Sequence, residues 1–260
     1  MNVFITAGGT SEPIDNVRSI TNTGTGRLGS IIADTFAKEQ RVDCIYYICA
    51  YNAVRPFSER VKVIPVQSTD DLQNEATKFL QNKKTDVIVH SMAVSDYKTK
   101  SVLTAGALAE VLKHELHSDT VITEEWTEKI LERASLPDCN CKLSSQMKSP
   151  LIHLEQTPKI LPKLRQLAPQ AILVGFKLLN QVSNEVLLNT ARELLLKNSC
   201  DFVLANDSSQ IHGDLHTAYL IDKDKTIGTY QTKEEIAVGI VEAVLSKGVY
   251  DRKLKILSWA

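Results

Sequence analysis

The sequence contains no long apolar run and no excess of charge. None of its runs approaches the roughly 18 apolar residues of a membrane-spanning helix, and the first apolar stretch, residues 3–5, is too short for the core of a signal peptide. The 30 Lys and Arg residues are balanced by 31 Asp and Glu residues, which leaves a formal net charge of -1. Without a basic excess, we expect neither nucleic acid nor a membrane surface as a partner. The expected location is cytoplasmic.

Cysteine is scarce and odd in number. Five cysteines spread over 260 residues argue against a disulfide framework, so reduced thiols are expected. Cys139 and Cys141 resemble half of a metal site, but a structural zinc site needs a second pair of Cys or His residues at suitable spacing, and none follows. We therefore expect no metal site made of side chains.

Short apolar runs alternate with longer amphipathic runs along most of the chain. Six apolar runs predict buried strands, at residues 2–6, 44–48, 61–64, 86–90, 171–174 and 201–204. Five amphipathic runs predict helices, at residues 28–38, 70–81, 160–167, 185–197 and 233–245. Residues 218–221 and 226–230 flank a polar turn and predict a hairpin. The expected fold is α/β, with a doubly wound, mostly parallel, Rossmann-like sheet, an antiparallel edge hairpin and a helical insertion.

Residues 98–140 interrupt this alternation. Helical runs at 105–115 and 124–134 predict a lid or a dimerisation segment inserted into a single domain of residues 1–260. The insertion carries apolar residues at spacings that can form a stripe: Val102, Leu103, Leu108, Val111, Leu112 and Leu116. The stripe either meets a second copy of the chain, giving a homodimer, or packs on the chain's own sheet.

Glycines follow the first predicted strand. Gly8 and Gly9 lie at the carboxyl end of a parallel strand, where glycine lets the backbone approach a ligand closely. The alternative is a tight strand exit. We favour a ligand-binding role because of the position at the strand end.

A literal G-x-G-x-x-G, formed by Gly24, Gly26 and Gly29, opens the next predicted helix. A long loop separates it from the strand, and no well-placed acidic residue follows, so the dinucleotide-binding interpretation loses its context. What remains is a helix N-terminus suited to a phosphate or another anion. Arg18 and Asn22 lie just before it and can add side-chain donors.

Two further polar residues are candidates for ligand contacts. Asp96 follows the fourth predicted strand, where it either caps a turn or accepts hydrogen bonds from a sugar or a base amine. Lys142 lies in a short polar segment after the insertion. It is either a solvated surface lysine or a phosphate ligand that the insertion brings to the site.

Taken in order, these segments resemble the phosphopantothenate–cysteine ligase family, in its stand-alone bacterial form. The matching segments are residues 5–10 (ITAGGT), 12–15 (EPID) with Val17 and Arg18, 20–22 (ITN) with Gly26 and Gly29, 93–97 (AVSDY), 142–145 (KLSS), 157–161 (TPKIL), 174–177 (VGFK) and 205–207 (AND). They span most of the chain in the order of the family. Eight segments in order are far more specific than any one of them.

The resemblance implies a ligase that joins 4'-phosphopantothenate to L-cysteine in coenzyme A biosynthesis. The carboxylate would attack the α-phosphate of a nucleoside triphosphate, and the amine of cysteine would then displace the nucleotide from the acyl-nucleotide. CTP is favoured and ATP stays open, with Mg²⁺ as the accompanying ion. The resemblance also implies a homodimer and a separate decarboxylase as pathway partner.

The resemblance also implies a role for individual residues. Asn22 matches the asparagine that holds the acyl-nucleotide, and Lys142 matches the catalytic lysine. The phosphate of the substrate is assigned to Arg18, Gly24 and Gly26. The nucleotide is assigned to Gly8, Gly9, Asp96, Pro158, Lys159, Ile160, Leu161, Phe176 and Lys197. Lys197 stands in for a lysine that the family often has at the position of Leu194.

Two other functions stay open from the sequence. The same strand ends could serve a non-catalytic module that binds a nucleotide or a flavin. An NAD(P)-dependent oxidoreductase is the other alternative, and the missing context of the glycine motif weighs against it.

Overall fold

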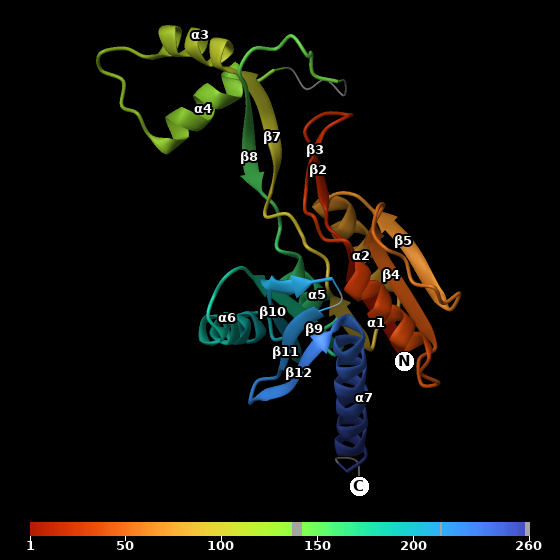
Figure 1. Ribbon diagram of the computed structural model, residues 1–260. Coiled ribbons are helices and arrows are strands. Elements are labelled where there is room, and N and C mark those ends of the chain that lie inside the picture. Colours follow the sequence, from red (N-terminus) through yellow and green to blue (C-terminus); the bar gives the residue numbers. More distant parts are fainter. Residues whose placement is uncertain (137–141, 214, 258–260) are drawn as a thin grey trace. The chain divides into compact units, whose positions relative to one another are not determined.

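A computed structural model describes residues 1–136, 142–213 and 215–257, with side chains as far as residue 247 (Figure 1). The chain folds into two compact units. We call residues 1–10, 23–94 and 159–260 the sheet unit, and residues 11–22 and 95–158 the ribbon unit. Each unit is described by itself below.

The sheet unit is built on an eight-stranded sheet in the order β12-β11-β10-β9-β6-β1-β4-β5. Its strands are β1 (Asn2–Ala7), β4 (Cys44–Ala50), β5 (Val61–Val66), β6 (Val87–His90), β9 (Ile172–Leu179), β10 (Phe202–His212), β11 (Leu215–Ile221) and β12 (Thr226–Thr232). The first six pair in parallel, and the last two add an antiparallel edge hairpin. The predicted α/β fold, with its mostly parallel Rossmann-like sheet and edge hairpin, is confirmed.

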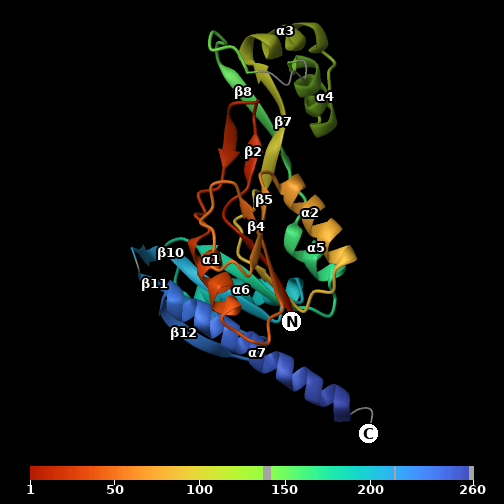
Figure 2. The same cartoon turned by 90° about the vertical axis from the view of Figure 1, so that its right-hand side faces the viewer.

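Helices cover both faces of this sheet (Figure 2). On one face lie α1 (Arg27–Ala37) and α7 (Lys233–Leu257), and on the other lie α2 (Thr69–Asn82), α5 (Ile160–Leu167) and α6 (Asn184–Lys197). Alternate residues of β1 enter different cores: Ile5 packs with α1 and α7, whereas Phe4 packs with α2 and α5. Burial on both faces explains why the central strands read as continuous apolar runs.

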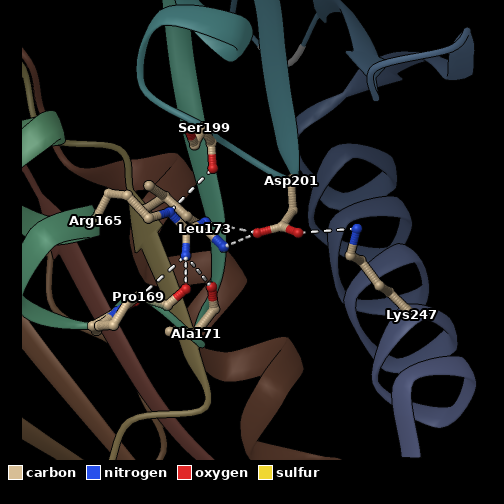
Figure 3. A network of polar contacts seen from close by, with 8 residues as sticks. Arg165, Pro169, Ala171, Leu173, Ser199, Asp201 and Lys247 are labelled. Carbon is tan, nitrogen blue, oxygen red and sulfur yellow. Dashed lines mark hydrogen bonds and ion pairs between the residues drawn. The ribbon is translucent and has the colours of Figure 1, made fainter. Parts of the chain in front are cut away.

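The amino-terminal ends of β9 and β10 are joined by an ion-pair network (Figure 3). Asp201 accepts hydrogen bonds from Arg165 Nη2 and from Leu173 N, both at 2.9 Å, and its other oxygen lies 2.9 Å from Lys247 Nζ. The Arg165 guanidinium also donates to backbone carbonyls, including that of Ala171 at 2.8 Å. The network ties α5 and α7 to the amino-terminal ends of these parallel strands.

The ribbon unit contains two antiparallel ribbons and two helices. Its strands are β2 (Ser11–Pro13), β3 (Ser19–Thr21), β7 (Tyr97–Thr104) and β8 (Pro150–Gln156), and its helices are α3 (Ala105–Glu115) and α4 (Glu124–Ala134). Both helices coincide with the predicted runs. The unit is larger than the predicted insertion, because it begins at Ser95, ends at Pro158 and includes residues 11–22.

The apolar stripe predicted for the insertion is not one helical face. Val102 and Leu103 belong to β7, where they are buried, and Leu103 pairs with Leu151 of β8. Only Leu108, Val111 and Leu112 lie on α3, while Leu116 follows the helix and is 49% exposed. Part of the stripe therefore serves the core of its own unit.

Candidate functional site

The turn after β1 is a tightly packed strand exit. Gly8 has a φ of 91°, and a Cβ added there would lie 2.9 Å from Ala53 Cβ and 3.0 Å from Ala50 Cβ. The carbonyl of Gly8 accepts a hydrogen bond from Ala93 N at 2.9 Å, and Gly9 forms a parallel bridge with Ala93. Gly8 therefore needs to be glycine for packing and for its φ, and the backbone of Gly8 and Gly9 lies at the carboxyl end of β1.

The G-x-G-x-x-G motif packs against this same turn. A Cβ on Gly24 would lie 2.9 Å from Gly8 O, and one on Gly26 would lie 2.9 Å from Ala53 Cβ. A Cβ on Gly29 would lie only 2.5 Å from Ala7 Cβ. The spacing of the three glycines is explained by the close approach of the loop and α1 to the end of β1, and it brings Gly8, Gly24 and Gly26 together.

The N-terminus of α1 is suited to an anion. Its N-cap is Gly26, which has no side chain to cap the helix, and Arg27 stands in the first turn. The hydroxyl oxygen of Tyr47 lies 3.2 Å from Gly26 O and 2.8 Å from Val54 O, and burial raises the pKa of Tyr47. This buried hydroxyl fixes the N-cap, so the positive end of the helix dipole has a defined position.

The segment that enters α5 contributes mainly backbone. Lys159 is the N-cap and is exposed, whereas Ile160 is 4% exposed and packs in the core under α2 and α5. Leu161 lies against Gly175 in the same layer, and Phe176 packs with the core on the other face of the sheet. Because these apolar side chains are used in packing, a nucleotide at this segment would meet the backbone and Lys159.

Lys197 is placed away from the other candidates of the sheet unit. It is the last residue of α6, just before Asp201, whose N–H donates to Leu173 O near the amino-terminal end of β9. Gly8 and Gly9 follow the carboxyl end of β1, so they lie at the opposite ends of the parallel strands. Lys197 and the Gly8–Gly9 turn thus lie at opposite ends of the parallel strands, and the assignment of Lys197 to the nucleotide stays a prediction.

The ribbon unit brings Asn22, Asp96 and Pro158 together. Asn22 Nδ2 donates to Ser95 Oγ at 3.1 Å, and the buried Ser95 carbonyl accepts from the hydroxyl of Thr157. Thr157 N donates to Asp96 O at 3.0 Å, which fixes the residue after it, Pro158. Ser95 and Thr157 link these three segments; both lie in matched segments, but sequence reasoning assigned neither of them a role.

A second group in the ribbon unit lies at the β2–β3 turn. Asp15 Oδ1 accepts from Val17 N at 2.8 Å and Arg18 N at 2.7 Å, and Asp15 Oδ2 accepts from Leu143 N at 3.0 Å. Arg18 Nη2 donates to Leu143 O at 3.3 Å. The hydrogen bond from Leu143, followed by those from Val17 and Arg18, lowers the pKa of Asp15. These bonds join the turn that carries Arg18 to the backbone of the residue after the exposed Lys142.

The Ala205-Asn206-Asp207 segment has a structural role in the sheet unit. Asp207 is buried and accepts hydrogen bonds from Gln181 N at 3.0 Å and Val182 N at 2.9 Å, which lead into α6. The hydrogen bond from the Ser209 hydroxyl, followed by these backbone bonds, holds the pKa of Asp207 well below its usual range. Asn206 Nδ2 lies 3.0 Å from His216 Nε2 in the core.

Metal ligation by side chains finds little support in the described residues. Within the part of the chain that the structure describes, no group of three or more His, Cys, Asp or Glu residues could hold a metal ion. Cys139 and Cys141, the pair considered from the sequence, lie outside the described residues.

None of the described helices combines the length and the apolar character that crossing a membrane requires.

Comparison with known proteins identifies one family. Residues 1–135 and 133–247 match the family described as the DNA/pantothenate metabolism flavoprotein C-terminal domain. The crystal structure of the DNA/pantothenate metabolism flavoprotein from Streptococcus pneumoniae is 34% identical, with a TM-score of 0.78, and the match covers 95% of this chain and 99% of that one.

Two other relatives are more distant. The coenzyme A biosynthesis bifunctional protein CoaBC of Methanocaldococcus jannaschii is 28% identical over 244 residues, which is 93% of this chain and 50% of the relative. The chain spans about half the length of the curated relatives it matches first. A mutant of Cab2 in complex with phosphopantothenate-cysteine shares the fold, with a TM-score of 0.66 at 17% identity over 97% of this chain and 88% of that one.

Proposed function

Because this chain belongs to the DNA/pantothenate metabolism flavoprotein C-terminal domain family, we propose that it is a ligase that joins 4'-phosphopantothenate to L-cysteine. The observation that carries the proposal is the composition of the ribbon unit. Arg18, Asn22, Asp96, Lys142 and Pro158 are scattered along the sequence, and all five belong to this one compact unit. Hydrogen bonds made by Ser95, Thr157 and Asp15 join the segments that carry these five residues.

The proposed reaction has two displacements. A carboxylate oxygen of phosphopantothenate attacks the α-phosphorus of a nucleoside triphosphate, pyrophosphate leaves, and an acyl-nucleotide forms. The amine of cysteine then attacks the acyl carbon, the nucleoside monophosphate leaves, and the amine loses a proton. Neither step needs a covalent enzyme nucleophile, so positioning and neutralisation of charge are the tasks left to the protein.

Each candidate residue fits one of these tasks. In our proposal, Asn22 donates to the acyl-nucleotide, and Lys142 neutralises charge on the phosphates. Arg18 and the backbone at Gly24 and Gly26 contact the phosphate of phosphopantothenate. Their support is chemical: an amide donor, two cations and a helix N-terminus all favour negative charge.

The nucleotide is proposed to contact the backbone at Gly8 and Gly9, the carboxylate of Asp96 and the segment Pro158 to Leu161 with Phe176. CTP is our proposed co-substrate, with ATP as the alternative. Mg²⁺ would enter as part of the co-substrate, since it binds nucleotides mainly through phosphate oxygens and keeps several waters. We also propose a homodimer and a separate decarboxylase that uses the product.

The deciding experiment measures pyrophosphate release with and without phosphopantothenate, using CTP and ATP in parallel. A ligase releases pyrophosphate only when the acid is present, and it releases nucleoside monophosphate when cysteine is added. Lys142→Gln should reduce both signals to a small residual rate, while Lys148→Gln, a change at an exposed lysine of the same segment, should leave them unchanged. Nucleotide binding without pyrophosphate release would show a binding module instead.

Light scattering at the assay concentration tests the proposed homodimer.

A further inference from the structure

The carboxylate of Asp15 holds two segments that are far apart in the sequence. Oδ1 accepts the N–H groups of Val17 and Arg18, which is the usual arrangement of a turn closed by aspartate. Oδ2 accepts Leu143 N at 3.0 Å, across 128 positions of sequence. The Asp15 side chain is only 2% exposed, so water competes little for these bonds.

The turn itself does not account for the second oxygen. Asp222 closes the β11–β12 turn in the same way, with one oxygen, Oδ1, that accepts Asp224 N at 2.9 Å and Lys225 N at 2.8 Å. A turn of this kind is therefore complete with one oxygen. At Asp15, the second oxygen serves the segment that follows Lys142.

The bond from Leu143 fixes the backbone of Lys142. The N–H that Asp15 accepts belongs to the peptide unit that joins Lys142 to Leu143, and the carbonyl of Leu143 accepts from Arg18 Nη2 at 3.3 Å. Leu143 is thus held on both of its backbone groups. Because the peptide unit between Lys142 and Leu143 is held, the Cα atom of Lys142 is held as well. The Lys142 side chain therefore extends from a fixed position.

We propose that Asp15 is a positioning residue that places Lys142 for the reaction, by accepting the N–H of Leu143. The proposal rests on the proposed function, in which Lys142 neutralises phosphate charge. A shift of about 1 Å in a positioned group can cost on the order of 10² in rate. Loss of the Leu143 bond should therefore lower kcat while the KM values stay near those of the wild type.

Asp15→Asn is the most direct variant. The asparagine oxygen can still close the turn, but its NH₂ group would face the Leu143 N–H, and two donors cannot bond. We expect kcat for pyrophosphate release to fall at least tenfold. Asp222→Asn is the matched control, because it makes the same change at a turn that holds no distant segment, and its kcat should stay within twofold of wild type. If Asp15→Asn does not fold, Asp15→Ser, which keeps a hydroxyl for the turn, takes its place.

Two readouts separate positioning from general structural damage. In the Lys142→Gln background, Asp15→Asn should cause no further loss of rate, because its effect passes through Lys142. Trypsin cleaves the Lys142–Leu143 bond, and the Asp15 variant should be cut there several times faster than wild type, with cleavage after Lys225 unchanged. Additive losses, or wild-type kcat in Asp15→Asn, would overturn the proposal. Unchanged cleavage at Lys142 would also overturn it, even for a chain that fails the ligase assay.

Discussion

Thr6 Oγ1 lies 2.7 Å from His90 Nδ1, at paired positions of β1 and β6. Both residues are buried, and burial lowers the pKa of His90 to about 4. His216, in contact with Asn206, also has a pKa lowered to about 4, by burial and then by the nearby charge of Lys233. Both imidazoles are therefore neutral in the folded chain at pH 7.

We predict that the sheet unit loses stability as the pH falls from about 6.5 to about 4. In this window the unfolded chain binds protons at both histidines and the folded chain does not, so the free energy of unfolding decreases by up to about 1.4 kcal/mol per pH unit for each group. Asp207, whose pKa is lowered, adds to the loss only below the ordinary value of 3.8.

Urea unfolding at a series of pH values checks this prediction. His90→Gln should reduce the slope of stability against pH by about half, since one of two titrating groups is removed. His117→Gln, at an exposed position, is the control and should leave the slope unchanged. An unchanged slope in His90→Gln would show that His90 is charged in the folded state.

We predict opposite effects for alanine at two helical glycines. Gly29→Ala in α1 would place a Cβ 2.5 Å from Ala7 Cβ and 2.8 Å from Ser91 Oγ, and such overpacking typically costs about 1–3 kcal/mol. Gly106→Ala in α3 meets only Thr104 Oγ1 at 3.8 Å, so helix propensity should dominate and stabilise its unit by up to about 1 kcal/mol. Thermal unfolding followed by circular dichroism measures both. If Gly106→Ala lowered the free energy of unfolding, the gain in helix propensity would not be the dominant effect at this position, and the prediction would be wrong.

The sheet could be predicted from the sequence because its strands are buried on both faces. Their apolar runs, such as residues 44–48, stand out against the amphipathic helices between them. The ribbons could not be predicted in the same way. The three residues of β3 are all exposed and those of β8 are mostly exposed, so neither carries the apolar alternation of a half-buried strand.

For the candidate site, the sequence indicated residues but not the contacts that support them. Family motifs indicated Asn22 and Lys142 but not the contacts near them: Asn22 donates to the hydroxyl of Ser95, and the residue after Lys142 is held through its backbone N–H. Asp15 was part of a matched motif, and its bond to Leu143 joins segments that no local spacing relates. Lys197 shows a similar limit, because its place in the sequence does not tell that it ends α6, at the opposite end of the parallel strands from Gly8 and Gly9.

We predict unequal costs for the two cations that bind Asp201 (Figure 3). Arg165 side-chain atoms are 19% exposed and the guanidinium donates in several directions, so Arg165→Lys loses its fork of donors and should cost about 1.5–3 kcal/mol. Lys247 is 37% exposed, and Lys247→Met should cost at most about 1 kcal/mol. Urea midpoints of the two variants give the comparison. If Lys247→Met cost as much as Arg165→Lys, loss of a charge would matter as much to the network as loss of the fork of donors, and the prediction would be wrong.

The final prediction concerns the amide of Asn22. Its Nδ2 donates to Ser95 Oγ at 3.1 Å, so the side chain is oriented before any ligand binds. Asn22→Asp replaces this donor with a carboxylate, which repels an acyl-nucleotide, and removal of an oriented donor of this kind typically costs about 10²–10³ in rate. Asn74→Asp makes the same chemical change at an exposed position of α2 and should leave the rate unchanged. Cysteine-dependent release of nucleoside monophosphate is the measurement, because it follows the step in which the acyl-nucleotide is consumed. Full turnover in Asn22→Asp would remove Asn22 from the site and leave Arg18 and Lys142 as its charged contacts.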